Sequence, residues 1–191
     1  MSVLVTGLVI FFAAHSVSIF NEPWRDRMAA KLGAQAWQGL YSLVAIAGLV
    51  LMIWGYGLAR IDPVALYSPP LWLRHLAILL LLPVFPLFLA TYLPGRIQAA
   101  TRHPMLAATK LWATGHLLAN GMLADVLLFG TFLIWAVVDR ISLKQRAQRP
   151  VPGVPPSKLN DLIAVLFGLA LYAAFIFWLH TWLIGVPPLG R

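Results

Sequence analysis

Residues 162–184 read LIAVLFGLALYAAFIFWLHTWLI, an uninterrupted run of 23 residues without a charged side chain. Because an α-helix rises about 1.5 Å per residue, this run makes a helix of about 35 Å. The hydrocarbon core of a bilayer is roughly 30 Å thick, and an apolar run of about 18 residues or more is typical of a transmembrane helix. We therefore predict that this segment crosses a membrane.

The rest of the chain has the same apolar character. Of its 191 residues, 61% are hydrophobic and 10% are charged, against roughly 45–50% and about 25% in a soluble domain. The net charge of +8 does not indicate a nucleic-acid partner, because the basic residues lie in short stretches between apolar runs, where they contact anionic lipid headgroups. We expect an all-α, polytopic transmembrane bundle surrounded by membrane lipid.

Five further apolar runs precede the quoted one, and together they predict about six transmembrane helices in a single domain, residues 1–191. Pro83 and Pro86 should kink the third helix, because proline removes a backbone donor. The fourth run has 15 residues and spans only about 22 Å, and Asn120–Gly121 is expected to form a tight turn after it. Ser157 and Asn160 are candidate caps of the last helix. The five runs are residues 3–20, 37–58, 71–93, 105–119 and 122–138.

The basic residues predict the orientation. Ten of the 14 Lys and Arg residues lie after the first, third and fifth runs, three lie on the other side, and Lys110 lies inside the fourth run. Cytoplasmic loops are enriched in Lys and Arg, so we expect both termini outside the cytoplasm. The first run lacks a basic flank and a convincing cleavage site, so we expect a retained span rather than a signal peptide. The ten are Arg25, Arg27, Lys31, Arg96, Arg102, Arg140, Lys144, Arg146, Arg149 and Lys158.

Few polar side chains fall inside the apolar runs, and these are the candidates for chemistry. A charged side chain at the bilayer centre costs about 2.5–3.5 kcal/mol on insertion scales, so its presence needs a reason. The chain has no cysteine, so a metal must be bound by His, Met, carboxylate or backbone groups. The candidates are His15, His75, His116, Asp125 and His180, with His103 in the loop before the fourth run.

His116 belongs to a polar and aromatic stripe. At helical spacing, Thr109, Trp112, Ala113, His116 and Asn120 share one face of the fourth helix. That face should point into the bundle. The stripe is interpreted either as a packing seam with a hydrogen-bonded histidine or as the wall of a cofactor site.

His15 lies on an aromatic and apolar face of the first helix, about 8 Å from its cytoplasmic end, whereas His116 lies roughly 15–20 Å deep. A neutral pair of imidazoles suits haem iron better than zinc, which needs four converging ligands or three and a water. Soft-metal and proton-relay roles stay open. His75 and His180 are placed near the outer surface, where they can pair. Asp125 is predicted to pair with Arg74, to relay protons or to orient a histidine.

Three patches of the sequence resemble NnrU proteins and, through them, zeta-carotene isomerase, a membrane enzyme of carotenoid synthesis. They are His15-Ser16, Thr101-Arg102-His103-Pro104, and the stretch from Trp112 through His116 to Asn120-Gly121. Arg-His-Pro also occurs in membrane isoprenyl-cysteine methyltransferases, but this chain lacks the C-terminal cofactor region that those enzymes need. The likeness in hydropathy extends over nearly the whole chain, which is identified as one NnrU-type transmembrane domain of a bacterial inner membrane.

The resemblance implies a b-type haem with His15 and His116 as axial ligands. Trp112 and Asn120 would line the pocket, with Arg102 and His103 at its cytoplasmic mouth. Ala113 stands where the isomerase has a cysteine, so ligand exchange through a thiolate is absent. NnrU proteins are associated with denitrification, which implies a small gaseous ligand, whereas the likeness to the isomerase implies a hydrophobic one. The alternatives are a haem-dependent isoprenoid isomerase and a non-catalytic assembly factor of membrane enzymes.

Overall fold

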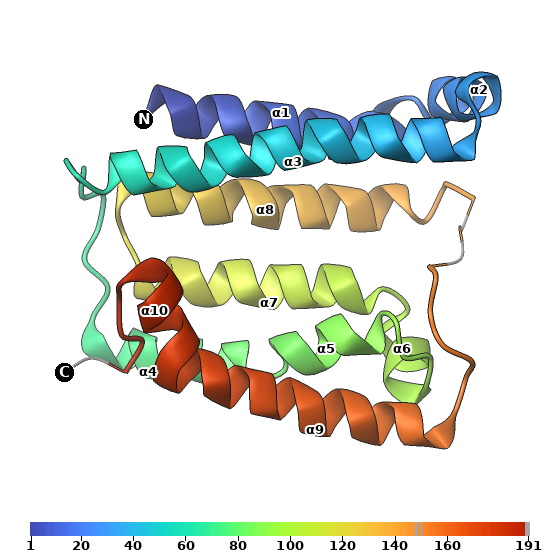
Figure 1. The fold of residues 1–191 in the computed structure, drawn as a ribbon. Coiled ribbons are helices and arrows are strands. Elements are labelled where there is room, and N and C mark those ends of the chain that lie inside the picture. Colours follow the sequence, from blue (N-terminus) through green and yellow to red (C-terminus); the bar gives the residue numbers. More distant parts are fainter. Residues whose placement is uncertain (148, 150, 190–191) are drawn as a thin grey trace. The chain divides into compact units, whose positions relative to one another are not determined.

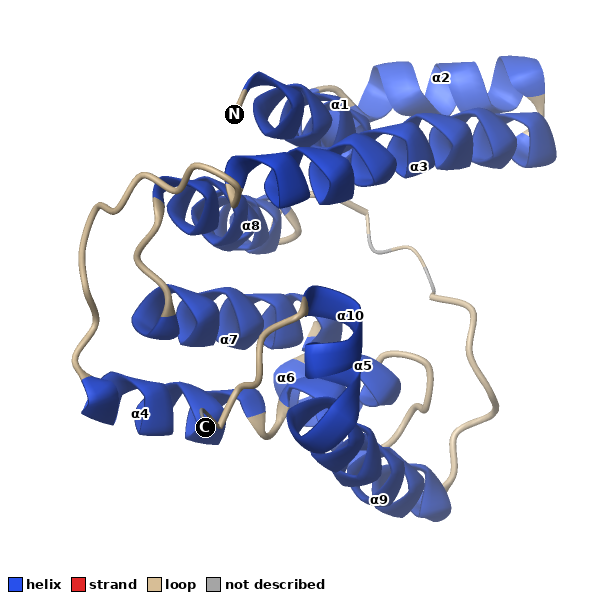
Figure 2. Ribbon diagram, turned by 60° about the vertical axis from the view of Figure 1, so that its left-hand side comes forward, coloured by secondary structure: helices blue, strands red, loops and turns tan. Residues whose placement is uncertain are grey.

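A computed structural model describes residues 1–147, 149 and 151–189. Within these residues the chain is helical, and its extended pairing is limited to an isolated antiparallel bridge between Ala65 and Met122 (Figure 2). The helices form two compact units, one of Met1–Pro69 with Asn120–Gln148 and the other of Pro70–Ala119 with Arg149–Arg191. We call them unit 1 and unit 2. The all-helical fold class predicted from the sequence is confirmed for the described residues.

Unit 1 is built on the close approach of its first and third helices, which run side by side in Figure 1. A Cβ atom on Gly7 would lie 2.4 Å from the backbone nitrogen of Met52, and one on Gly48 would lie 2.6 Å from that of Phe11. Glycine is therefore needed at both positions, because the two backbones meet there directly. The helices of unit 1 are α1 (Ser2–Phe20), α2 (Glu22–Leu32), α3 (Ala34–Ala59) and α8 (Leu123–Ser142).

The core of unit 1 lies along the inner faces of α1, α3 and α8. Its buried side chains are joined at the margin by aromatic rings that include Phe11, Phe132 and Trp135. At one end of this core Asp125, which is only 6% exposed, accepts hydrogen bonds from the Tyr56 hydroxyl at 2.5 Å and from the Met122 amide at 3.1 Å. The buried members are Leu4, Leu8, Phe12, Met52, Ala59 and Ala124.

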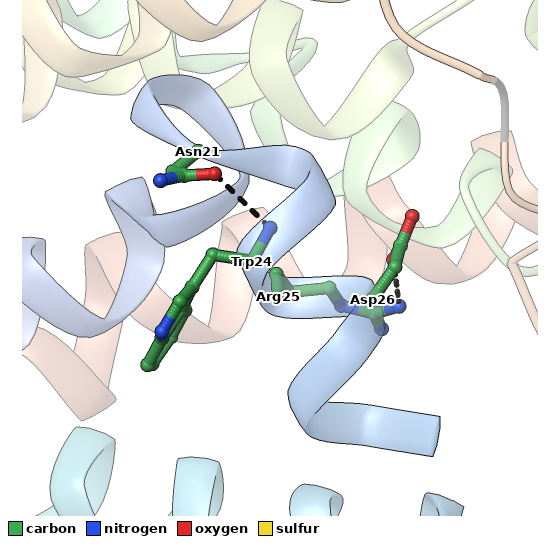
Figure 3. Close-up of polar contacts among 4 residues, drawn as sticks. All are labelled: Asn21, Trp24, Arg25 and Asp26. Carbon is green, nitrogen blue, oxygen red and sulfur yellow. Dashed lines mark hydrogen bonds and ion pairs between the residues drawn. The ribbon is translucent and has the colours of Figure 1, made fainter. Parts of the chain in front are cut away.

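The polar segment after the first span forms a helix of its own, α2. The Asn21 side chain caps it by accepting a hydrogen bond from the Trp24 amide at 3.0 Å, and Arg25 pairs with Asp26 at 2.9 Å (Figure 3). An Asn cap satisfies an amide that has no partner within the helix. The Trp24 and Trp37 rings meet edge to face at 6.0 Å, which ties α2 to the start of α3.

Unit 2 contains the broken third span. The sequence predicts a kink at Pro83 and Pro86. The structure confirms a break at Pro83, because one helix ends at Leu81 and the next begins at Val84, whereas Pro86 lies in the first turn of that second helix. A Cβ on Gly168 would lie 2.4 Å from the nitrogen of Pro86, so the second half of this span packs closely on the last one. The helices are α4 (Leu71–Leu81), α5 (Val84–Ala90), α6 (Arg96–Thr101), α7 (Pro104–Ala119), α9 (Lys158–Ala174) and α10 (His180–Ile184).

The ends of α6 and α9 are fixed by polar side chains. Asp161 accepts hydrogen bonds from the amides of Arg96 at 2.8 Å and Ile97 at 3.0 Å, so α9 caps α6. Ser157 caps α9, as the sequence predicts, by accepting from the Leu159 amide at 3.2 Å. Asn160 is buried and does not cap: its amide donates to the carbonyls of Pro94 and Pro155.

Four helical segments of the described chain are long and apolar enough to cross a membrane: Ser2–Phe20, Ala34–Ala59, Leu71–Ala90 and Lys158–Ile184. Two of the six predicted spans fall short of that standard for different reasons. α7 has only 16 residues, about 24 Å of helix. α8 has 20 residues but carries Asp125, Asp139 and Arg140. The membrane-helix character of the chain is thus supported by four segments.

Candidate functional site

His15 is held in aromatic surroundings within unit 1. Its Nδ1 lies 2.7 Å from the Phe11 carbonyl oxygen, one turn earlier in α1. Its ring stacks on Phe11 at 4.0 Å and meets the rings of Tyr41 at 5.2 Å and Trp135 at 5.9 Å edge on. Because a carbonyl oxygen only accepts, Nδ1 carries the proton and Nε2 carries the lone pair of the neutral ring.

Trp135, one of the aromatic residues around His15, has a hydrogen-bond donor for which the described residues supply no acceptor. The indole Nε1 of Trp135 is buried and has no hydrogen-bond partner among the described residues. A buried N–H without a partner costs free energy, so its presence in a folded protein needs an explanation. One explanation is an acceptor atom on a bound molecule.

His116 is oriented in the same way on α7, in unit 2. Its Nδ1 lies 2.8 Å from the Trp112 carbonyl oxygen, and the Trp112 ring lies 5.2 Å from the imidazole, centroid to centroid. The next residue on that face, Ala113, is fully buried. Of the stripe predicted from the sequence, the structure buries Ala113 and leaves Thr109, Trp112, His116 and Asn120 partly exposed. The backbone carbonyl of Trp112 orients the imidazole.

The structure brings His180 to His116. Their rings lie 6.5 Å apart with 24° between their planes. The Nδ1 of His180 lies 2.6 Å from the Val186 carbonyl oxygen, so this ring too donates through Nδ1 and keeps its lone pair on Nε2. Donation from one ring nitrogen to a backbone carbonyl is the arrangement that metal-bound histidines commonly show.

A local irregularity sets the direction of His180. The five residues before it, Phe175–Leu179, form a π-helix, labelled η1. A single π turn adds one residue to the helix, which turns everything after it by about 100° relative to an uninterrupted α-helix. Gly185 then ends α10 in the left-handed conformation, with φ of 78°, and the chain folds back to bring the Val186 carbonyl to His180.

The Arg102-His103-Pro104 motif forms the corner between α6 and α7. Arg102 has a positive φ of 61°, which is unusual for a residue with a side chain, and its amide donates to the Gln98 carbonyl at 2.8 Å. Pro104 opens α7, where its missing amide hydrogen costs nothing. His103 is separated from His116 by most of α7, about 20 Å of helix, so the motif shapes the far end of the helix from His116.

Asn120 and Asp125 serve the connection from α7 to α8. The carbonyl of Asn120 accepts the Tyr67 hydroxyl at 2.8 Å, and a Cβ on Gly121 would lie 1.9 Å from the Tyr67 carbonyl oxygen. Asp125 closes the first turn of α8 through the Met122 amide. Its other oxygen accepts the Tyr56 hydroxyl. The three roles predicted from the sequence, pairing with Arg74, proton relay and orientation of a histidine, stay predictions.

His75 lines an apolar groove of about 350 Å³ in unit 2. At its wall the Tyr172 hydroxyl donates to the Ile78 carbonyl at 2.6 Å, which leaves apolar and aromatic surface toward the groove. Leu82, Ile176, Phe177 and Leu189 complete most of that lining.

The donor set decides which metal the histidines suit. Among the described residues no group of three or more His, Cys, Asp or Glu side chains converges as a metal site. Zinc needs at least three protein ligands, whereas haem iron receives four nitrogens from its porphyrin and needs only one or two imidazoles. Oriented single or paired imidazoles therefore fit haem and do not fit zinc.

The sequence did not predict that His116 and His180 lie close together. It placed His180 near His75 instead. The π-helix has no sequence signal that we recognise, and the register of His180 depends on it. Gly185, one turn after His180, was the available hint that the chain reverses there.

These features define an all-helical protein with transmembrane-type helices and backbone-oriented histidines inside them. The profile of the NnrU protein family matches residues 3–188, and the chain belongs to this family. Searches of curated proteins and of solved structures return no significant match.

Proposed function

We propose that this NnrU-family protein is a multi-pass protein of the bacterial inner membrane, with six crossings and both termini outside the cytoplasm. The loops that follow the first, third and fifth spans carry most of the basic residues. α7, with 16 residues, crosses where the bilayer thins or its ends snorkel. The absence of cysteine in the chain makes single-cysteine labelling a clean test.

Lys144→Cys and Asp62→Cys report the two sides in that test. Intact cells should label the cysteine at position 62 with a membrane-impermeant maleimide, whereas the cysteine at position 144 should react only after permeabilisation. Equal labelling of both from one side would refute the topology.

The protein further binds one b-type haem, with His116 as an axial ligand. The observation that carries this proposal is the oriented imidazole of His116, whose Nδ1 donates to the Trp112 carbonyl. When bound, haem supplies an iron that accepts small ligands or electrons. In keeping with the resemblance to NnrU proteins, we place that chemistry in nitrogen-oxide metabolism.

The sequence predicts His15 as the second axial ligand, with Trp112, Asn120, Arg102 and His103 around the cofactor. Two features of His15 support a ligand role: its Nδ1 is bonded to the Phe11 carbonyl, and the Trp135 Nε1 beside it lacks an acceptor. His15 and His116 belong to different units, so spectroscopy of the intact protein must decide their relation.

The test is the absorption spectrum of the full-length protein purified in mild detergent from haem-replete cells. The wild type should show a Soret band, and His116→Ala should lose it or shift it. Thr114→Ala, a change on the same helix that leaves His116 in place, is the matched control. A well-folded wild type without bound haem would refute the haem proposal and favour a non-catalytic assembly factor.

A second candidate function is a haem-dependent isoprenoid isomerase. The apolar groove with His75 and Phe177 in its lining supports it, because an isoprenoid chain needs such surface. A polyene extracted with the purified protein, and converted between cis and trans isomers by it, would favour this candidate. Nitric oxide binding to the iron without any bound polyene would favour the nitrogen-oxide role.

A further inference from the structure

A groove in unit 1 runs along α1 and ends at the start of α2. Its volume is about 520 Å³, which lies within the roughly 300–1,000 Å³ of ligand-binding pockets. Phe12 and Ser16 are buried and form its floor, whereas Val9 and Phe20 are exposed and form its rim. All of the lining belongs to unit 1. The other lining residues are Ala13, Val17, Asn21 and Trp24.

The groove has the length of one membrane leaflet. Val9 and Phe20 are 11 residues apart, which is about 17 Å along a helix. One leaflet contributes half of the roughly 30 Å hydrocarbon core, or about 15 Å. The helix that carries the groove is one of the four segments able to cross a membrane. The groove therefore matches the space that a lipid acyl chain fills in one leaflet.

The helix at the end of the groove separates its charges. Because successive residues of an α-helix are turned by about 100°, Trp24, Arg27 and Lys31 lie on one face of α2, and Glu22 and Asp26 lie on the opposite face. Figure 3 shows the side chains of Trp24 and Asp26 extending from different sides of α2. Arg27 and Lys31 are exposed. The face that lines the groove through Trp24 thus carries two cations.

Two cations beside an indole ring match a phosphate group at the membrane surface. Tryptophan prefers the headgroup layer, and Lys and Arg near that layer attract anionic lipids. Arg27 lies about 4.5 Å and Lys31 about 10 Å beyond Trp24 along the helix, and both side chains are long enough to reach back toward it. An arginine can also form two parallel hydrogen bonds with one phosphate.

We propose that unit 1 binds one anionic phospholipid of the surrounding membrane, with an acyl chain in the groove along α1 and its phosphate on Arg27 and Lys31. This site goes beyond the proposed haem function and does not depend on it. The proposed topology only assigns the lipid to the inner leaflet, where basic segments face anionic lipid. A zwitterionic lipid fits the groove as well, but its own cation offsets the charge of the phosphate.

Native mass spectrometry of the full-length protein in detergent tests the headgroup. The protein is titrated with phosphatidylglycerol or with phosphatidylcholine of the same acyl chains, and the wild type should bind one phosphatidylglycerol more tightly. Arg27→Gln combined with Lys31→Gln should reduce this preference by about fivefold for each cation. Arg140→Gln combined with Lys144→Gln removes the same charge at the end of α8 and should keep the preference.

Ala13→Leu tests the groove in the same titrations. Ala13 is exposed and lines the groove, so the larger side chain occupies the place of the acyl chain. It should weaken the binding of both lipids and leave their ratio unchanged. Ala47→Leu is the matched control, since Ala47 is exposed on α3 outside the groove. Circular dichroism shows whether each variant is folded.

Four results would overturn the inference. The first is equal binding of the two lipids by the wild type. The second is a preference that falls as far in the α8 double variant as in the α2 double variant, because overall charge then explains it. The third is wild-type binding of both lipids by Ala13→Leu. The fourth is a protein dimer that Ala13→Leu dissociates, since the groove then receives a second copy of the chain. The Soret band tests the haem proposal separately.

Discussion

Gly55→Ala tests the close packing of α1 on α3, which holds the wall around His15 together. A Cβ at position 55 would lie 2.2 Å from the backbone nitrogen of Leu4 and 2.7 Å from the carbonyl carbon of Val3. Backbone atoms cannot rotate away, so the two helices must separate by more than 1 Å to regain ordinary contact distances of roughly 3.5–4.0 Å. Leu4, which is fully buried at this point, would lose contacts along the seam.

The expected cost follows from these contacts. Overpacking of a well-packed interior costs about 1–3 kcal/mol, whereas replacing glycine by alanine within a helix contributes about 1 kcal/mol of stability. Gly57→Ala is the matched control, since it makes the same change in the same helix where nothing lies within 4 Å of the new Cβ. Because both variants share the helical gain, it cancels in their comparison, and we expect Gly55→Ala to be about 1–3 kcal/mol less stable than Gly57→Ala.

The assay is equilibrium unfolding in mixed micelles with increasing sodium dodecyl sulfate, followed by circular dichroism and tryptophan fluorescence. Gly57→Ala should match or exceed the wild type in its midpoint, and Gly55→Ala should unfold earlier. If the two variants unfold together, α1 and α3 do not meet backbone to backbone at Leu4 and Gly55.

Three further variants test the cap of α6, the packing of α9 on α5, and the pKa of a tyrosine in unit 1. Asp161→Ala should cost about 1 kcal/mol and speed hydrogen exchange at the Arg96 and Ile97 amides, which Asp161 caps, whereas Asp26→Ala breaks only an exposed ion pair and should be nearly neutral. Gly168→Ala should destabilise unit 2, since its Cβ would lie 2.4 Å from Pro86, and Gly130→Ala, with open space around it, is its control in a thermal melt. Burial and the nearby Asp125 carboxylate raise the pKa of Tyr67, so Asp125→Asn should lower that pKa. Ultraviolet titration against Tyr67→Phe measures the shift, and an unchanged titration would show that the carboxylate does not act on the phenol.

Several elements of the fold follow from the sequence because their causes are local. The run 162–184 lies within a helix that is long and apolar enough to cross a membrane. Pro83 breaks the third predicted span because it has no amide hydrogen. Ser157 caps the next helix because its hydroxyl accepts from the Leu159 amide, two residues later. Asn21 offered the same kind of signal, yet α2 escaped notice because its polar residues read as a loop between spans.

The candidate site likewise has some features with local causes and others that depend on tertiary structure. The histidines could be picked out from the sequence because polar groups are costly in hydrocarbon and therefore stand out in apolar runs. Their orientation is also local. Each imidazole bonds to the carbonyl one helical turn earlier, His15 to that of Phe11 and His116 to that of Trp112. The neighbour of His116 was decided by tertiary structure alone. His180 reaches it through a π turn and a left-handed glycine, and which side chain such irregular turns bring to which helix depends on packing between segments that are distant in the chain.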